Sequence, residues 1–377
     1  MSADTAQPRT VHGSAHESTP ATGNSLAQLF DPRANSLNNL RLILATLVAV
    51  VHASAISLGT QPVLGRTEVG SMAVDAFFVL SGFLVARSYD RIGSFIRYAW
   101  HRFLRIMPLF WIVLIVTAFV VAPAIAALEG QSPLSVFQGE NASWHYVVEN
   151  SLLYIAPQNF GVAGLPNGTA TPHVVNGALW TLFYEVVCYV MVACLGVVGL
   201  LRRNRWLVIA LAGLFGAATI TQEFTDIDLP AGLFLRFFWV FLLGTLAYLY
   251  QDRLPITWPW ALVALGVVAA SLAFLHDYRS LGGPAFAYLC MWAVVRTPWL
   301  RRNLRWDLSY GMYVFHWPIE TMLVVSGVSA ALGLIGYTIL AVLLAASLAA
   351  VSWNVIESPA LSKKNIPLPF DRTPGRR

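Results

Sequence analysis

Long runs of apolar residues alternate with short polar connections over most of the chain, and this pattern predicts a bundle of membrane-spanning helices. Each run holds about 20 residues, enough for a helix to cross the ~30 Å hydrocarbon layer at ~1.5 Å per residue. The runs predict ten spans, at residues 38–58, 71–87, 106–127, 177–201, 206–222, 232–251, 256–275, 284–299, 307–326 and 332–354. The fold class expected is therefore an all-α integral membrane protein.

The polar segments complete the predicted organisation. Residues 1–36 are rich in Ser, Thr, Ala, Pro and Gly and have no apolar core, so we expect a disordered cytoplasmic tail. Residues 37–358 would form one membrane domain and residues 359–377 a second cytoplasmic tail. Residues 128–176 form a long outer loop, in which apolar positions recur at helical spacing and predict an amphipathic helix on the membrane surface. These positions are Trp144, Val147, Val148, Ser151, Leu152 and Ile155.

Basic residues gather in alternate connections, and this bias orients the bundle. With the amino terminus inside, the inner connections hold thirteen arginines and the outer ones only Arg66 and Arg279. The thirteen are Arg87, Arg91, Arg97, Arg102, Arg105, Arg202, Arg203, Arg205, Arg253, Arg296, Arg301, Arg302 and Arg305. Ten spans return the chain to the same side. We therefore expect a multi-pass protein of the cell inner membrane with both termini in the cytoplasm.

Composition excludes several other classes of protein. The chain is 57% hydrophobic and 11% charged, against about 25% charged for soluble domains, so an ordinary soluble domain is excluded. Its net charge of +5 comes from residues at the ends of apolar runs rather than from a basic stripe, so nucleic acid is not an expected partner and membrane lipid is. Its three cysteines lie inside apolar runs without CxxC spacing, which predicts neither a disulfide framework nor a zinc site.

Ionisable side chains inside predicted spans are costly, and each is a functional candidate. They are His52, Asp75, Glu185, Arg236, His316 and Glu320. From the helical rise, His52, Asp75 and Glu185 converge in the outer half of the membrane, and His316 lies near the midplane. Imidazole titrates near neutral pH, so His52 is the candidate general base. Glu185 or Asp75 could fix its tautomer, although Asp75 could equally cap its helix or pair with an arginine.

Two other positions keep alternative interpretations. His316 and Glu320 stand four residues apart on one helical face and could be read as metal ligands, but no third ligand is apparent and we expect no metal. Arg236 could recognise an anionic acceptor or pair with Asp75 or Glu185.

Arg41 and His52 are eleven residues apart, which is about three helical turns, so they project from one helix face ~16 Å apart. That spacing suits a ligand with an anionic head at the inner surface and a reactive end inside the membrane, as in an acyl-coenzyme A. Arg102 and Arg105 in the inner loop would add phosphate contacts of the bidentate kind. The alternative is that this arginine cluster only reflects membrane topology.

The order and spacing of several stretches also resemble a family, the acyltransferase family 3 membrane O-acyltransferases. The resemblance covers residues 37–360. The matching stretches are Leu40–Arg41 to His52, Val74–Phe83 with Ser81-Gly82, Arg102–Pro108, Leu179–Glu185 with Trp180, Phe241–Gly244, and Ser309–Pro318 with His316.

The resemblance implies a ten-helix bundle that takes an acyl group from cytoplasmic acyl-coenzyme A and delivers it to a hydroxyl reached from the outer side. It implies catalysis by His52 with acidic positions at Asp75 and Glu185, and it places the donor on three arginines. These are Arg41, Arg102 and Arg105. Trp180, Arg236 and His316 are the candidate substrate-binding residues. Many relatives carry an extracytoplasmic hydrolase-like domain, so this chain is expected either to finish the transfer or to hand the acyl group to a separate extracytoplasmic transferase.

The function expected is O-acyl transfer, acetyl from acetyl-coenzyme A, to a glycan, glycolipid or other glycosylated acceptor. Direct attack by a hydroxyl that His52 deprotonates and a covalent acyl-histidine route both fit the sequence. A rival from another class is a carrier that moves a polar lipid or sugar without chemistry, using the same buried charges. A third option is a structural subunit of a surface-polymer assembly complex. Only an enzyme that uses coenzyme A needs both the Arg41–His52 pair and the inner arginines.

Overall fold

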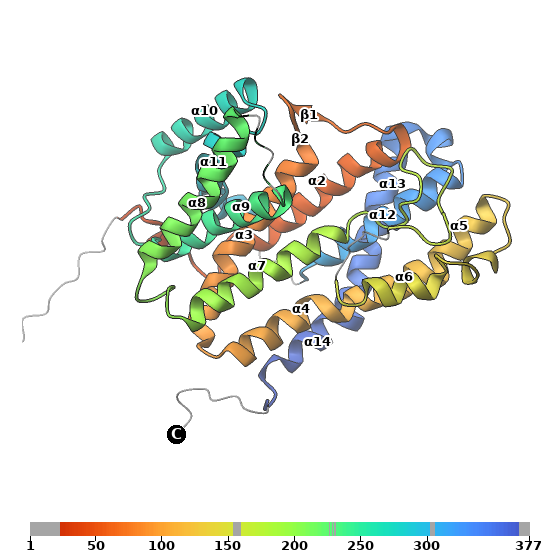
Figure 1. Cartoon of the computed structure of the whole chain (residues 1–377), viewed down its shortest axis with the longest axis horizontal. Helices are drawn as coiled ribbons and strands as arrows, with labels where there is room; N and C mark the ends of the chain where they lie inside the picture. The colour runs from red at the N-terminus through yellow and green to blue at the C-terminus, as the bar shows by residue number, and fades with distance from the viewer. Residues whose placement is uncertain are drawn as a thin grey trace, which may run out of the picture.

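Helices make up nearly all the regular secondary structure in the computed structural model, which describes residues 23–153, 160–225, 227, 229, 231–301 and 306–368 (Figure 1). The longer helices are α2 (Leu37–Leu58), α3 (Val69–Ile92), α4 (Phe95–Val116), α7 (Trp180–Val197), α8 (Arg205–Phe224), α9 (Gly232–Leu249), α10 (Trp258–Phe274), α11 (Arg279–Arg296), α12 (Ser309–Val325) and α13 (Val328–Ser352). The short ones are α1 (Leu26–Leu29), α5 (Ala122–Leu128), α6 (Ser143–Asn150) and α14 (Ser358–Ser362), with single turns at Ser135–Phe137, Pro298–Leu300 and Lys363–Asn365 and π-turns at Thr117–Val121 and Trp353–Glu357. Strands β1 (Val63–Leu64) and β2 (Thr67–Glu68) form one antiparallel hairpin.

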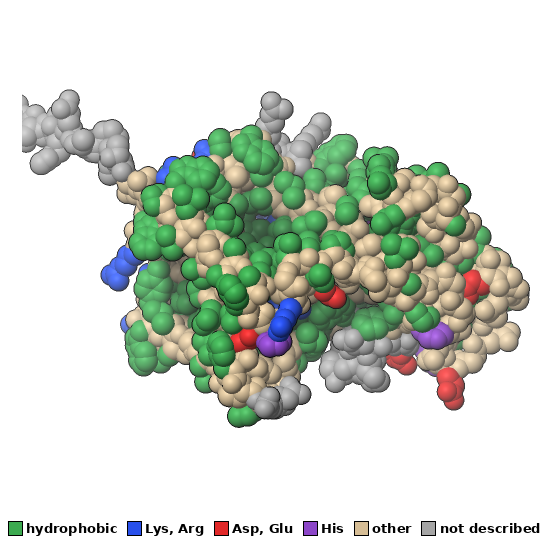
Figure 2. Space-filling model, turned by 90° about the horizontal axis from the view of Figure 1, so that it is seen from above, with side chains coloured by type: hydrophobic (Ala, Val, Ile, Leu, Met, Phe, Trp, Pro, Cys, Tyr) green, Lys and Arg blue, Asp and Glu red, His purple; other side chains and the backbone are tan. Residues whose placement is uncertain are grey.

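The helices are those of a multi-pass membrane protein. Among the described residues, seven helical segments are long and apolar enough to cross a membrane, and each of the ten predicted spans contains a helix. Helix α10 is apolar but shorter, and α11 and α12 are not among the seven, so the count of ten stays a prediction. Hydrophobic side chains cover much of the face in Figure 2. Leu214 of α8, Leu262 of α10 and Ile335 of α13 are 65%, 62% and 77% exposed, as lipid-facing residues would be.

Two span boundaries differ from the prediction. The third span is a continuous helical segment from Phe95 to Leu128, 34 residues long, rather than 106–127. At ~1.5 Å per residue it is ~51 Å long and exceeds the hydrocarbon layer, so its arginine-rich start extends into the polar region. The last span continues from Val328 to Asn365. Trp100 donates to the Lys363 carbonyl over 3.1 Å, so the first residues of the expected second tail pack on α4.

The expected disordered tail is also ordered over its last fourteen residues, 23–36. Leu26 is fully buried, and its N–H donates to the Leu254 carbonyl over 2.8 Å. Phe30 packs edge-on against Phe83, with Arg87 stacked over its ring at 4.8 Å. These two apolar side chains and the backbone hydrogen bonds to residues 251–256 anchor the stretch. Residues 1–22 and 369–377 of the two expected tails lie outside the described residues.

Helices α3 and α9 cross with their backbones in close contact. A Cβ added at Gly82 would lie 2.1 Å from the Phe241 carbonyl oxygen, and one at Gly244 would lie 1.9 Å from that of Val79. In a membrane, lipid tails are as apolar as leucine, so helices associate through such close packing rather than through a hydrophobic driving force. The glycines of two family-like stretches therefore hold the fold together.

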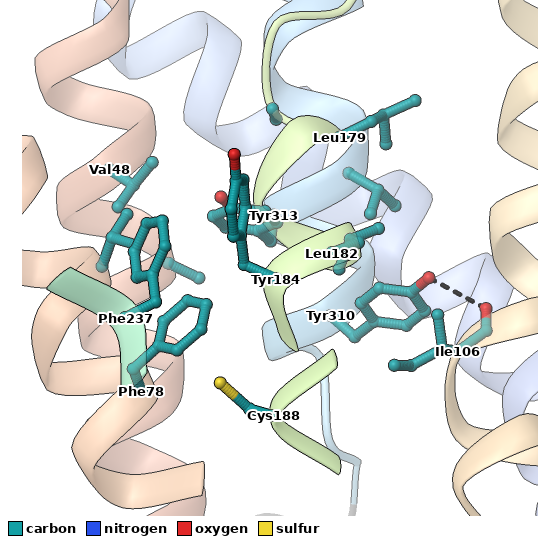
Figure 3. Packing of buried hydrophobic residues seen from close by; sticks show 14 of the residues in the cluster. Val48, Phe78, Ile106, Leu179, Leu182, Tyr184, Cys188, Phe237, Tyr310 and Tyr313 are labelled. Atoms are coloured by element: carbon teal, nitrogen blue, oxygen red, sulfur yellow. Dashed lines mark hydrogen bonds between the residues drawn. The ribbon is translucent and has the colours of Figure 1, made fainter. Parts of the chain in front are cut away.

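Aromatic side chains fill the centre of the bundle between α3, α7, α9 and α12. Phe78 stacks on Phe237 with ring centroids 4.2 Å apart, and Tyr184 lies against Phe237 at 5.1 Å (Figure 3). Tyr310 donates its hydroxyl proton to the Ile106 carbonyl over 2.9 Å, which links α12 to α4. Each aromatic pair contributes about 0.5–1.5 kcal/mol beyond its buried area. The packing fixes the positions of α7 and α12, which carry site residues.

The helix predicted within the long loop forms as α6. Two of its apolar side chains are exposed, Trp144 at 50% and Val148 at 65%, whereas Tyr146 is buried; Leu152, just beyond the helix, is 81% exposed. An exposed apolar face on a short helix suits a membrane surface. Ile155, the last position of the predicted pattern, lies outside the described residues.

Candidate functional site

Two histidines from distant segments meet inside the bundle. His52 Nδ1 of α2 lies 2.9 Å from His316 Nε2 of α12, and the two rings are nearly parallel. The Trp317 ring packs edge-on against His52 with centroids 4.8 Å apart. His316 is fully buried. The pair places the predicted base beside a residue that was expected near the midplane and assigned to substrate binding.

The hydrogen bonds assign the tautomer of both rings. His316 Nδ1 lies 3.3 Å from the Met312 carbonyl oxygen, which can only accept, so Nδ1 carries the proton. In the neutral ring Nε2 is then an acceptor, and His52 Nδ1 must donate to it. His52 Nε2 is left with its lone pair, the form that a general base needs.

Histidine 316 therefore takes the place in which a carboxylate was expected. Both oxygens of Asp75 are occupied elsewhere: Arg236 Nε and Arg279 Nε lie 2.9 and 2.6 Å away, and the Tyr278 hydroxyl donates over 2.9 Å. Asp75 is wholly buried. Asp75 and its partners join α3, α9 and α11. This arrangement fits the interpretation in which Asp75 pairs with an arginine, and in which Arg236 pairs with Asp75.

Glu185 also forms its hydrogen bonds with residues other than His52. Its carboxylate accepts from the Ser81 hydroxyl over 3.2 Å and from the Tyr189 hydroxyl. The geometry does not support Glu185 as the group that orients His52.

A narrow cavity lies beside Glu185 and reaches Tyr313, a ring neighbour of His316. Its volume is about 40 Å³, and it lies between α2, α3, α7 and α12. Arg41 and Ser309 line it at one end and Tyr313 at the other, where the Tyr313 ring lies 6.0 Å from that of His316. We call the end of the bundle at Arg41 the arginine end, and the opposite end, where residues 128–153 and 160–177 lie, the loop end. The cavity thus runs from the arginine end towards the two histidines.

Asp307 organises the arginine end, where Glu357 Oε2 also lies 3.9 Å from Arg105 Nη1. Asp307, which precedes α12, accepts from Arg105 Nη2 over 2.7 Å and lies 3.4 Å from Arg41 Nη1. The Ser309 hydroxyl donates to it over 2.7 Å. Burial by itself would raise the pKa of Asp307, but the two guanidiniums and the Ser309 hydrogen bonds hold it well below its usual range. Arg41 and Arg105 are therefore fixed side by side in their charged form.

The structure separates Arg102 from this pair. Its guanidinium lies over the rings of Tyr98 and Tyr189, 5.9 and 5.6 Å from their centroids, and contacts the Ser88 hydroxyl at 3.4 Å. It lines a groove of about 390 Å³ between α4 and α7. Of the two loop arginines, only Arg105 joins Arg41.

Trp180 is packed rather than free in a pocket. Its ring lies 5.7 Å from those of Tyr184 and Phe237, at the start of α7. No side chain of the histidine pair is among these ring contacts, so the geometry gives Trp180 a packing role.

The long loop covers the histidine pair from the loop end. The Ala170 N–H donates over 2.9 Å to the carbonyl of Ile56, one turn beyond the histidine of α2. Trp317 Nε1 donates to the Val174 carbonyl over 3.2 Å, and Asn176 also donates to a carbonyl of α12. Residues 167–177 thus pack onto both histidine-bearing helices.

Comparison with known proteins agrees with this arrangement. The family model described as an acyltransferase domain matches residues 34–353. This chain belongs to the acyltransferase family. It is 25% identical over 359 residues to an "O-acetyl transferase" of Shigella phage Sf6, covering 90% of this chain and 99% of that protein. It is 30% identical over 372 residues to "Nodulation protein 10" of Rhizobium leguminosarum bv. viciae, covering 87% and 93%. No solved structure matches.

The family resemblance and the class of enzyme, an acyltransferase, are therefore confirmed. Sequence reasoning missed Asp307 and the Asp75–Arg279 contact in this acyltransferase. Arg279 carried a signal, because it was one of only two arginines on the predicted outer side. Asp307 is an acidic residue beside an arginine-rich connection, and the same charge bias could have marked it.

Proposed function

We propose that this acyltransferase moves a short acyl group, acetyl, from cytoplasmic acyl-coenzyme A to a hydroxyl of a glycan, glycolipid or other glycosylated acceptor. The observation that carries the proposal is the alignment of three parts along one axis. Arg41 and Arg105 lie at one end, the narrow cavity follows, and at its other end Tyr313 contacts His316, the partner of His52.

The arginine end suits the donor. Two guanidiniums on a shared carboxylate recognise phosphate groups in a planar, bidentate manner. The ~16 Å between Arg41 and His52 along α2 then leaves room for an extended pantetheine arm in a widened cavity. Arg102 contributes to the electrostatic attraction of the donor without lining the cavity.

His52 is the general base in the proposed reaction. Its Nε2 takes the proton of the acceptor hydroxyl, and the hydroxyl oxygen bonds to the thioester carbon. The carbon–sulfur bond breaks, and the coenzyme A thiolate leaves and takes up a proton, which restores neutral His52. His316 is a positioning residue, because it keeps His52 Nδ1 as a donor and stabilises the imidazolium as it forms.

The acceptor approaches from the loop end. With the arginine end in the cytoplasm, the loop end faces outward from the inner membrane and both termini are cytoplasmic, as the positive-inside bias indicates. A transfer completed by this chain needs no separate extracytoplasmic transferase.

Transfer of label tests the proposal. Membranes with wild type, His52→Ala or His276→Ala, at matched expression, receive radiolabelled acetyl-coenzyme A and a total envelope glycan and lipid fraction. His276 is an exposed histidine at the loop end, so its variant is the matched control. We expect a labelled product with wild type and His276→Ala but not with His52→Ala. A protein that neither transfers label nor binds coenzyme A would instead support the carrier.

A further inference from the structure

The groove between α4 and α7 lies on the outside of the bundle. Its volume is about 390 Å³, and it shares no lining residue with the narrow cavity. Phe95 and Val190 line it and are exposed, so it opens to the surface that lipid would cover. The hydroxyls of its two tyrosines already have partners, because Tyr98 donates to the Tyr189 carbonyl and Tyr189 donates to Glu185. Apart from one arginine, the groove offers a ligand mainly apolar walls.

That arginine, Arg102, has unused hydrogen-bonding capacity. Its Nη2 reaches the Ser88 hydroxyl only over 3.4 Å, and its Nε is buried without a partner among the residues that the structure describes. None of the ion pairs between described residues includes Arg102. A guanidinium that faces lipid without a counter-ion is costly, and such groups are almost always paired. The groove therefore lacks an anion at Arg102.

The surroundings of Arg102 are those of a membrane–water boundary. Trp100, two residues earlier on α4, donates its indole N–H to the carbonyl of the exposed Lys363. Tryptophan and basic residues are typical of the level at which lipid headgroups lie. From this level the groove follows α4 to Trp111, nine residues or ~14 Å further along the helix. A ligand in the groove can thus have a polar end at Arg102 and an apolar end in the hydrocarbon layer.

We propose that the groove is a binding site for an anionic membrane phospholipid, with its phosphate on Arg102 and one acyl chain between α4 and α7. The Nε and Nη2 atoms of Arg102 form one edge of the guanidinium, which can donate two parallel hydrogen bonds to phosphate oxygens. The apolar walls contact the acyl chain. Basic pockets between spanning helices near the cytoplasmic surface are typical of phospholipid headgroup sites. With the arginine end in the cytoplasm, the lipid belongs to the inner leaflet.

The bound lipid changes the charge beside the narrow cavity. Arg102 lies over the Tyr189 ring, and the Tyr189 hydroxyl donates to Glu185 in the cavity wall. Without the lipid, the charge of Arg102 is free to attract the donor. The lipid phosphate neutralises that charge, and the attraction of the donor then depends on Arg41 and Arg105. Lipid binding itself depends only on the groove, so the inference does not rest on the proposed function.

Lipid titration tests the site. Delipidated full-length protein in a neutral detergent receives phosphatidylglycerol or phosphatidylcholine of equal chain length, and native mass spectrometry gives the dissociation constant of the first bound lipid. We expect phosphatidylglycerol to bind about tenfold more tightly, because the choline cation offsets the attraction between Arg102 and the phosphate. Arg102→Met should abolish the preference, whereas Arg203→Met, which removes an exposed arginine after α7, should keep it. Equal binding of the two lipids by wild type, or the same preference in Arg102→Met, overturns the site.

A second variant tests the acyl-chain part of the site without changing any charge. Ala99 lines the groove and is exposed, so Ala99→Trp fills the groove from the lipid side, and Ala99→Ser is the control of similar size. We expect Ala99→Trp, but not Ala99→Ser, to weaken phosphatidylglycerol binding about tenfold. Unchanged binding by Ala99→Trp overturns the placement of the acyl chain.

Competition separates the lipid from soluble phosphates. Neither coenzyme A nor inorganic phosphate should displace phosphatidylglycerol from wild type, because neither has an acyl chain to place in the groove. Displacement of the lipid by coenzyme A would assign Arg102 to the donor, and displacement by inorganic phosphate would assign it to a free anion. Either result overturns the lipid site.

Discussion

His52 Nδ1 of α2 and His316 Nε2 of α12 lie 2.9 Å apart, although 264 residues separate them in the chain. The contact determines which nitrogen of His52 carries its proton. In a hydrolytic triad a carboxylate has this task, whereas here a second neutral imidazole has it. Two neutral rings avoid placing a charge in the resting site, which a membrane interior would penalise.

Replacement of His316 tests its positioning role. His316→Phe keeps an aromatic ring but removes the acceptor, so His52 is free to take the other tautomer. We expect the rate of acetyl transfer to fall about 100-fold or more with the dissociation constant of coenzyme A unchanged. His316→Gln offers an acceptor again and should recover part of the rate and the wild-type pH profile. Wild-type rates in His316→Phe would contradict the role.

Replacement of Asp75 separates structure from catalysis. Asp75→Asn leaves Arg236 without its carboxylate and Arg279 with Asp277 alone, and we expect a loss of about 3–5 kcal/mol in the free energy of unfolding. Asp90→Asn is the control, because its partner Arg202 is 63% exposed and such pairs contribute about 0–1 kcal/mol. Thermal unfolding in detergent measures both. A slow Asp75→Asn enzyme with wild-type stability would return Asp75 to the catalytic residues.

The effect of replacing a helix glycine with alanine is expected to depend on what surrounds the glycine. Gly82→Ala and Gly244→Ala force a methyl group into a backbone carbonyl and should destabilise the protein by about 1–3 kcal/mol. Gly266→Ala in α10 has nothing within 4 Å and should stabilise by about 0.5–1 kcal/mol through helix propensity. Melting temperatures in one detergent compare the three. The same sign for all three would show that α3 and α9 do not cross this closely.

Asp307 gives a defined pH dependence. Its pKa is lowered on folding, so the stability it contributes is present above the unfolded value of ~3.9 and disappears as the pH falls through the folded pKa. We expect Asp307→Asn to melt below wild type at pH 7 and the gap to narrow progressively as the pH falls below about 4. Asp252 is exposed, so Asp252→Asn should have the melting temperature of wild type both at pH 7 and in acid. A gap that widens in acid would contradict the ion pairing.

The sequence determined the helices and predicts their direction, because both depend on local properties. Apolar runs of about 20 residues mark segments that lipid can surround, and the side of the arginines orients them. The spacing of Arg41 and His52 predicted one shared helix face, and in the structure both residues contact the segment 307–316. Gly82 and Gly244 belong to the family-like stretches, but the sequence did not indicate their packing role.

Tertiary structure decided the partners. Depth along a helix gave His52, Asp75 and Glu185 similar heights, but depth leaves the rotation and neighbours of each helix undefined. The α3–α9 glycine crossing brings Asp75 to Arg236. The packing of α2 on α12 leaves His316, and no carboxylate, beside the base. Hydrophobic periodicity cannot identify which helices pack together in a membrane, because any apolar face can contact lipid. Close packing between particular helix faces determines the neighbours.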